Sequence, residues 1–253
     1  MTSPAQAPPR FRYFDLVMAG FVTVLLCSNL IGPGKSCAVN LHANIVPRWT
    51  EAGLAWGPQL IFSVGSIFFP LSYIFGDVLT EVYGYARARR VIWAGFVAML
   101  FASIMAQVVI HLPPDSGEPF NERMQPSLET LFGSTWRIVI ASALAFWVGD
   151  FANSYVLAKL KVLTRGRWLW TRTIGSTIIG QGLDSLIFFP VAFAGIWTND
   201  TLARIVVFNW IFKVMVEVVL TPATYAAVGF LKRAEGVDHY DVDTNFTPFS
   251  LKY

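Results

Sequence analysis

The chain has 253 residues, of which 55% are hydrophobic and 14% are charged, and its formal net charge is +3. Because an ordinary soluble domain carries roughly 25% charged residues, this composition and a mean hydropathy of +0.52 predict a polytopic helical membrane protein. The small positive charge fits basic cytoplasmic loops and argues against a nucleic-acid partner.

The two ends of the chain are predicted to lie outside the bilayer. Residues 1–13 form a Pro/Ala-rich tail that we expect to be disordered and cytoplasmic. This tail lacks the apolar core and cleavage site of a signal peptide, so the first span should stay in the mature protein. Residues 14–231 are predicted to form one transmembrane domain, and residues 232–253 a polar cytoplasmic tail that is disordered or lies on the surface.

Six segments each approach the roughly 20 apolar residues that cross a bilayer. The predicted fold class is therefore all-α, with six transmembrane helices. The first span should be broken near Gly32-Pro33-Gly34, and the second and fifth should be kinked at Pro70 and Pro190. A long charged loop is expected over residues 113–136. In chain order the predicted spans are residues 14–39, 58–81, 91–112, 137–160, 173–197 and 202–231.

The distribution of Lys and Arg between the loops predicts the orientation. Thirteen fall on one side of the predicted bilayer and five on the other. Because cytoplasmic loops are enriched in Lys and Arg, the first side and both termini are predicted to be cytoplasmic. The thirteen are Arg10, Arg12, Arg87, Arg89, Arg90, Lys159, Lys161, Arg165, Arg167, Arg172, Lys232, Arg233 and Lys252.

Polar side chains inside the predicted spans are the main functional signal. An ionised side chain at the centre of a span costs roughly 2.5–3.5 kcal/mol, so these residues should converge on a common interior site rather than face lipid. The candidate site residues are Asn29, Asp77, Glu81, Asp150, Asn153, Gln181, Asp184, Asn209, Lys213 and Glu217.

Helical spacing places several of these residues on shared faces. Residues three or four apart lie on the same side of a helix. This holds for Asp77 with Glu81, Asp150 with Asn153, Gln181 with Asp184, and for the series Asn209, Lys213 and Glu217.

Structural roles compete with a binding role for some of these side chains. Lys213 and Glu217 can neutralise each other within one helix, and Glu81 can pair with the arginines that follow it. Gln107 stands alone on its span and is expected to form a helix–helix hydrogen bond rather than a ligand contact. Cys27 and Cys37 lie in or at the end of the first span, which argues against a disulfide or metal site.

Several blocks of the sequence resemble the queuosine precursor transporter family, also called vitamin-uptake-like transporters. The resemblance covers about residues 14–231. The blocks are the Ser28-Asn29 pair, FFPLSYIFGDVLTEVYGYARARR from Phe68, GDFANSYVLAKLK from Gly149, RTIGSTIIGQGLDSLIFFPVAF from Arg172, and NWIFKVMVEV from Asn209.

The resemblance implies a six-helix inner-membrane protein that imports 7-cyano-7-deazaguanine or 7-aminomethyl-7-deazaguanine. It also implies a fold similar to the substrate-binding components of energy-coupling-factor transporters, action without an ATPase module, and no cofactor. A homo-oligomer is compatible with it. Under this hypothesis Asp184 or Glu217 accepts hydrogen bonds from the donor edge of the base, Gln181 reads the acceptor, and Asp77 or Lys213 gates or couples transport.

Two other functions stay open from the sequence. The first is a substrate-binding subunit of an ATP-driven energy-coupling-factor transporter, which would require a separate coupling subunit. The second is a membrane enzyme that uses the buried acids. The sequence has no Ser or Cys nucleophile with a neighbouring base and no cluster of metal-ligating His, which argues against an enzyme.

Overall fold

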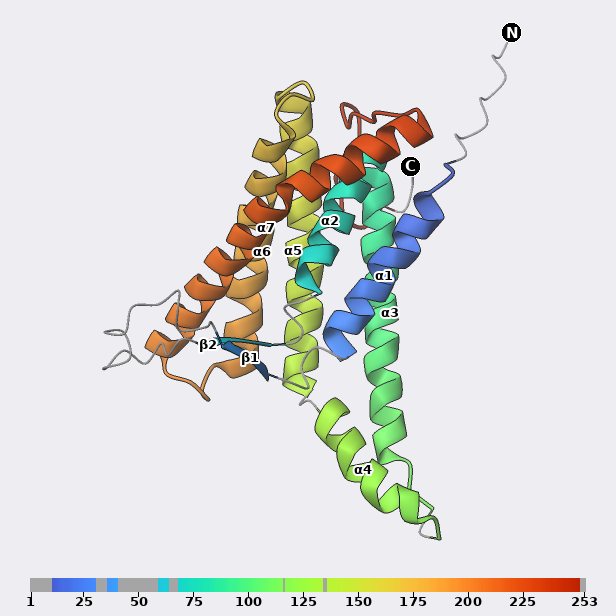
Figure 1. Cartoon of the computed structure of the whole chain (residues 1–253), viewed down its shortest axis with the longest axis vertical. Helices are drawn as coiled ribbons and strands as arrows, with labels where there is room; N and C mark the ends of the chain where they lie inside the picture. The colour runs from blue at the N-terminus through green and yellow to red at the C-terminus, as the bar shows by residue number, and fades with distance from the viewer. Residues whose placement is uncertain are drawn as a thin grey trace.

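The computed structural model describes residues 11–30, 36–40, 59–63, 68–115, 117–133 and 136–250. Long helices dominate this part of the chain (Figure 1). In chain order the elements are α1 (Phe14–Leu30), β1 (Ser36–Asn40), β2 (Gln59–Ser63), α2 (Phe69–Val78), the π-helical segment η4 (Leu79–Tyr83), α3 (Tyr85–His111), α4 (Pro119–Phe132), α5 (Trp136–Leu163), α6 (Leu169–Phe193) and α7 (Asn199–Glu235).

The helix lengths support a multi-pass membrane protein. Among the described helices, α3, α5, α6 and α7 are long and apolar enough to cross a bilayer. The apolar α1 has 17 residues, and α2 has 10 before η4 continues it. The predicted count of six spans therefore stays a prediction, while the mainly helical membrane fold is confirmed.

A short antiparallel ribbon replaces the inner ends of the first two predicted spans. β1 pairs with β2, with Ser36 opposite Ser63 and Asn40 opposite Gln59. The predicted limits at residues 39 and 58 are therefore wrong, and the fold is not purely α-helical. Pro70 lies in the first turn of α2, where its missing N–H leaves no helical hydrogen bond unmade, so it begins a helix instead of kinking one. The predicted break at residues 32–34 lies outside the described residues.

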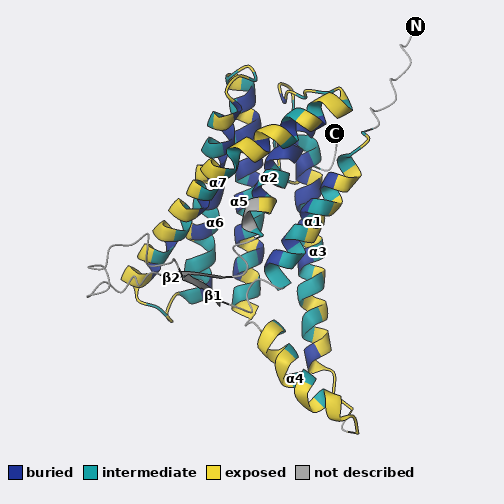
Figure 2. Cartoon of the chain, in the orientation of Figure 1, coloured by how far each residue is buried: buried dark blue, intermediate teal, exposed yellow. Residues whose placement is uncertain are grey.

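The segment predicted as a long loop over residues 113–136 contains α4. The side chain of Glu118 accepts a hydrogen bond from the Phe120 N–H, and Pro119 occupies the first turn. Gln107 of α3 donates to the carbonyl of Phe132 at the end of α4, at 2.8 Å, which confirms its predicted role between helices. α4 has no buried residue and projects away from the bundle (Figure 2).

Six helices close a ring in which each contacts two neighbours. The order around the ring is α1, α3, α5, α6, α7 and α2, and α2 returns to α1. The short α2 also contacts α5 across the ring, so its side chains reach the interior. Exposed residues lie along the outer faces of the long helices (Figure 2). Many of them are large and apolar, as expected for surfaces that meet lipid. They include Val97, Phe101, Ile104 and Met105 of α3 and Ile211, Met215, Val218 and Val219 of α7.

The described part of the C-terminal tail is packed against the bundle, so of the two predicted alternatives the structure favours a tail on the surface over a disordered one. Arg89 of α3 donates to the carbonyls of Asn245 and Thr247, both at 2.7 Å. The Trp93 indole donates to the carbonyl of Pro248 at 2.8 Å. These bonds hold the described part of the tail along α3.

Asp241 in this tail caps the N-terminus of α3. Its carboxylate accepts the Tyr85 N–H at 3.0 and 3.2 Å and the Thr244 hydroxyl at 2.8 Å. Burial alone would raise the pKa of Asp241, but hydrogen bonds from His239, the Tyr85 N–H and Thr244 outweigh it and hold the pKa below its ordinary value. A negative charge at this position also complements the helix dipole.

We expect Asp241→Asn to lower the free energy of unfolding by about 1 kcal/mol, the usual contribution of a helix cap. Because the pKa of Asp241 is lower in the folded state, the contribution is fully present above its unfolded pKa of about 4 and is lost as the pH falls through the folded value. Thermal unfolding in detergent at neutral and acidic pH measures both effects. Asp243→Asn is the matched control, since Asp243 is exposed, and an equal effect of both variants would contradict the cap.

Candidate functional site

Polar side chains, most of them buried or half-buried, gather at two levels of the helical ring. One group lies where α5 ends and α6 begins, and we call it the end cluster: Glu81, Lys161, Arg172, Lys232 and Asp238. The other lies near the middle of α5, α6 and α7, and we call it the midspan cluster: Tyr73, Asp77, Asp150, Asn153, Gln181, Asp184, Ser185, Lys213 and Glu217.

Glu81 is the centre of the end cluster. Its side chain is 0% exposed, and Arg172 of α6 donates two hydrogen bonds to its carboxylate, at 2.7 and 2.8 Å. Lys232 of α7 lies 2.5 Å from the same carboxylate, and Lys161 of α5 lies 3.4 Å away. The expectation that Glu81 pairs with the arginines that follow it was wrong, because its partners come from three other helices.

Asp238 completes the end cluster from the C-terminal tail. It accepts hydrogen bonds from Lys161 at 2.6 Å and Lys232 at 2.7 Å. Lys161 also donates to the backbone carbonyl of Glu81 at 2.7 Å. Burial opposes the ionisation of Asp238, but the two lysines outweigh it and hold the pKa of this carboxyl below its ordinary range. The cluster thus joins η4, α5, α6, α7 and the tail through ion pairs between three cations and two carboxylates.

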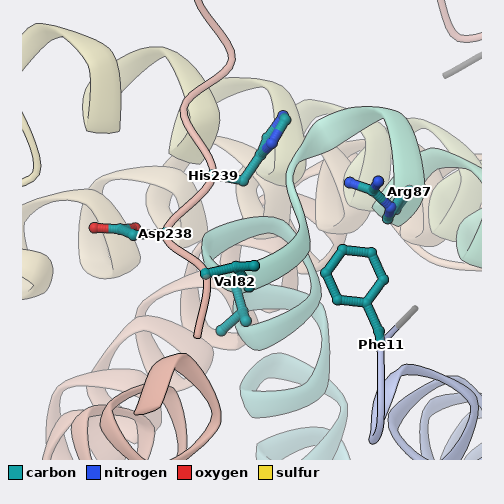
Figure 3. Close-up of a pocket in the computed structure, with 6 residues that line it drawn as sticks. Phe11, Val82, Arg87, Asp238 and His239 are labelled. Atoms are coloured by element: carbon teal, nitrogen blue, oxygen red, sulfur yellow. The ribbon is translucent and has the colours of Figure 1, made fainter. Parts of the chain in front are cut away.

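A pocket opens beside the end cluster, between the start of the chain's described part, η4 and the tail (Figure 3). Its lining includes Phe11, Arg87, Asp238 and His239. The guanidinium of Arg87 lies 4.5 Å from the centre of the Phe11 ring, and the ring of His239 occupies the space beside Gly84. This pocket contains none of the predicted site residues.

The midspan cluster brings together polar residues from α2, α5, α6 and α7. Asn153 of α5 donates to Asp77 of α2 at 3.0 Å. The Tyr73 hydroxyl donates to Gln181 of α6 at 3.2 Å. These contacts unite three of the four polar helix faces predicted from spacing.

The fourth face, on α7, joins the cluster through Lys213 and Glu217. Lys213 forms an ion pair with Asp184 of α6, rather than the predicted pair with Glu217 on its own helix. Glu217 is 0% exposed and lies close enough to Asp77 and Tyr73 for electrostatic interaction.

Several buried oxygens of the midspan cluster lack a hydrogen-bond partner among the described residues. They are Asp77 Oδ2, Asn153 Oδ1, Ser185 Oγ and both carboxyl oxygens of Glu217. Buried polar groups in folded proteins are nearly always satisfied, and each exception requires an explanation. In contrast to the end cluster, the midspan cluster therefore has unused capacity to accept hydrogen bonds.

Small residues allow α5 and α6 to approach closely enough to form this cluster. A Cβ atom added to Gly180 would lie 2.7 Å from Asn153 Cβ and 2.8 Å from the carbonyl oxygen of Gly149. One added to Gly149 would lie 3.1 Å from Asp184 Cβ. Close crossings of this kind are typical of helix packing in membranes.

The cavity beside these residues is small. It has a volume of about 10 Å³, and its lining includes Phe21, Gly76, Asp150 and Asn153. Pockets that hold small molecules are usually roughly 300–1,000 Å³. The structure is therefore closed around the midspan cluster, and a ligand the size of a purine requires the helices to separate.

Two predicted site residues form side-chain hydrogen bonds within their own helices. Asn29 donates to the carbonyl of Leu25 and Asn209 to that of Ile205, each four residues earlier on its own helix. Lys161, Arg172 and Lys232 were predicted only as basic residues of the cytoplasmic side, and Asp238 was not predicted as a site residue. The positions of the three cations at span ends, level with Glu81, were the available signal. Ser185, which is buried in α6, was likewise not predicted.

Comparison with known proteins identifies the family. The family model described as "Putative vitamin uptake transporter" matches residues 63–227. A protein of Bacillus subtilis named "Probable queuosine precursor transporter" is 33% identical over 169 residues, which cover 66% of this chain and 72% of that protein. The chain belongs to the queuosine precursor transporter family.

Two further relatives agree with this assignment. A "Probable queuosine precursor transporter" of Haemophilus influenzae is 27% identical over 196 residues, covering 75% of this chain and 78% of the relative. The "Queuosine precursor transporter" of Escherichia coli is 25% identical over 170 residues, covering 65% and 71%. No solved structure matches. As a member of this family, the protein is a membrane transporter and not an enzyme.

The family match includes the whole midspan cluster, because residues 73 to 217 lie within the matched segment. The end cluster is only partly included, since Lys232 and Asp238 lie beyond residue 227. The match therefore extends over every helix face that carries unused hydrogen-bonding capacity.

Gly180→Ala should lower the free energy of unfolding by about 1–3 kcal/mol, because the added methyl group forces α5 and α6 apart. Thermal unfolding in detergent measures this effect. Gly229→Ala on α7 is the control, since a Cβ there meets nothing within 4 Å. Equal stability of the Gly180 variant and the wild type would contradict the close crossing.

Glu81→Gln should destabilise the fold by about 3–5 kcal/mol, because it leaves the buried cations of the end cluster without their central counter-ion. Asp200→Asn serves as the control, since it breaks an exposed pair with Arg204 whose side chains are 73% and 80% exposed, and such pairs contribute little. If both variants unfold at the wild-type temperature, Glu81 does not hold the helices together.

Proposed function

We propose that this protein imports the deazaguanine precursors of queuosine, 7-cyano-7-deazaguanine or 7-aminomethyl-7-deazaguanine, across the inner membrane. The observation that carries the proposal is the set of unsatisfied buried oxygens in the midspan cluster. The names of the relatives indicate the substrate class. A base with several adjacent N–H donors is the type of ligand that these oxygens can accept.

Glu217 is the preferred partner for the donor edge of the base. A deazaguanine presents a ring N–H beside an exocyclic amine, and a carboxylate can accept both. Both oxygens of Glu217 are buried and without a partner in the described part of the chain. Asp184, the other carboxylate considered for this role, is already paired with Lys213.

Gln181 is the proposed donor to the carbonyl of the base. The Tyr73 hydroxyl donates to the side-chain oxygen of Gln181, which fixes the orientation of the amide. The amide nitrogen is then directed to donate to a ligand acceptor. Asn153 and Ser185 supply further oxygens for the remaining donors of the base.

The charges at the two ends of the bundle support the proposed orientation in the membrane. The end cluster and the basic loops that flank it are proposed to lie on the cytoplasmic side, with both termini. The compensated end cluster closes that side of the bundle, and release into the cytoplasm would require α5, α6 and α7 to separate there. We propose that the six helices of the ring all serve as membrane-spanning elements and that the protein works without an ATPase subunit.

Import is tested in a host that cannot synthesise the base and lacks its own importer. We expect expression of this protein to restore queuosine in tRNA when either precursor is supplied at low concentration, read as a mobility shift of the tRNA. Purified protein in liposomes without an ATPase subunit should also take up the labelled base. Restoration that requires a co-expressed ATPase module would favour an energy-coupling-factor subunit instead.

Glu217→Gln should reduce uptake by at least about tenfold, because it removes a charged acceptor whose hydrogen bonds contribute about 1.5–3 kcal/mol each. Asp200→Asn, which changes an exposed acid on the same helix, should leave uptake unchanged. Membrane levels of both variants are compared by immunoblot. Wild-type uptake by a correctly inserted Glu217→Gln protein would contradict this assignment of the site.

A further inference from the structure

The midspan cluster holds more acids than bases. Its acidic members are Asp77, Asp150, Asp184 and Glu217, and its cation is Lys213. Lys213 is already paired with Asp184. Unpaired charges in a dry interior are strongly unfavourable, so the other acids of this cluster require positive charge from elsewhere.

Two of these acids lie on α2 and α7, which pack against each other. Asp77 and Glu217 are each 0% exposed, and Asp77 Oδ2 and both carboxyl oxygens of Glu217 lack a hydrogen-bond partner among the described residues. The other titratable groups near Asp77 and Glu217 are Tyr73, Asp150 and Glu81, together with Lys213, which lies one turn before Glu217 on α7 and forms an ion pair with Asp184. The cations nearest Glu81 are engaged with Glu81 itself and with Asp238.

A proton is the positive charge that this geometry accommodates. Two carboxyl groups at close range in a buried site cannot both ionise and instead share a proton. The part of the chain that the structure describes holds no group of three or more His, Cys, Asp or Glu side chains arranged to bind a metal ion. Asn153 donates to Oδ1 of Asp77, while Oδ2 is left without a partner, so Oδ2 is the atom available for protonation.

We infer that Asp77 and Glu217 form a proton-binding site and that one proton travels with each substrate molecule. The inference rests on the proposed function for its transport step. Glu217 must be ionised to accept the donor edge of the base, which places the proton on Oδ2 of Asp77. After the base and the proton leave together, the carboxyl groups of Asp77 and Glu217 carry two uncompensated negative charges. The pair must bind another proton before the bundle closes.

The proton site can be tested without transport. Infrared spectra of the purified protein in lipid at neutral pH should contain the carbonyl band of a protonated carboxyl group. Asp77→Asn should remove this band, and Asp200→Asn should retain it. Should Asp77→Asn fail to fold, Asp77→Glu serves instead, because it should shift the frequency of the band, whereas an unshifted band would assign the proton to another carboxyl group. A wild-type spectrum without the band would overturn the inference.

Coupling is tested in liposomes with labelled 7-cyano-7-deazaguanine and 7-aminomethyl-7-deazaguanine. An inward proton gradient should accelerate accumulation several-fold, a protonophore should abolish the acceleration, and Asp77→Asn should lose the response to the gradient. Uptake that ignores the proton gradient, or that follows a sodium gradient, would overturn the inference while leaving the proposed function intact. Absence of uptake under every gradient would contradict the proposed function, and the infrared band would still decide whether the proton site exists.

Discussion

The compensation of the buried Glu81 carboxylate is the interaction on which the rest of the structure depends. Arg172, Lys161 and Lys232 approach it from α6, α5 and α7, and Asp238 ties two of these cations to the tail. Removing one partner from such a group leaves charges buried without compensation, which is far more costly than losing an exposed pair. The end cluster therefore fixes the register of the long helices relative to η4.

The anchored position of Glu81 also sets the geometry of the midspan cluster. Asp77 lies one helical turn before Glu81 on the same face, so anchoring Glu81 also positions Asp77 between α5 and α7. The close approach at Gly149 and Gly180 then brings Asn153 and the α6 residues alongside. The polar groups of the end cluster have protein partners and support the fold. The midspan cluster instead has buried oxygens that lack hydrogen-bond partners among the described residues. That contrast supports the proposal that the ligand binds at the midspan cluster.

Acids near the C-terminus bind the N-terminal ends of two helices, and apolar side chains form the outer faces of the bundle. Asp241 caps α3 from a distance of more than a hundred residues along the chain, and Glu235 accepts the N–H groups of Arg12 and Tyr13 just before α1. Both acids lie after the long hydrophobic part of α7 and satisfy helix ends that lack caps of their own. The outer faces carry apolar side chains, so the bundle keeps its polar groups inside and meets lipid with hydrocarbon.

The sequence by itself determined the membrane class, the four long helices, the family resemblance and the polar residues of the interior, because hydropathy, helical spacing and sequence motifs are local properties. Only the tertiary structure decided which of these residues meet. Glu81 pairs with distant cations rather than with its neighbours, Lys213 pairs with Asp184 rather than with Glu217, and Pro70 begins a helix where a kink was expected. The ribbon of β1 and β2 and the packed tail were likewise not predicted. In each case the outcome depends on contacts between segments far apart in the chain, which local patterns do not specify.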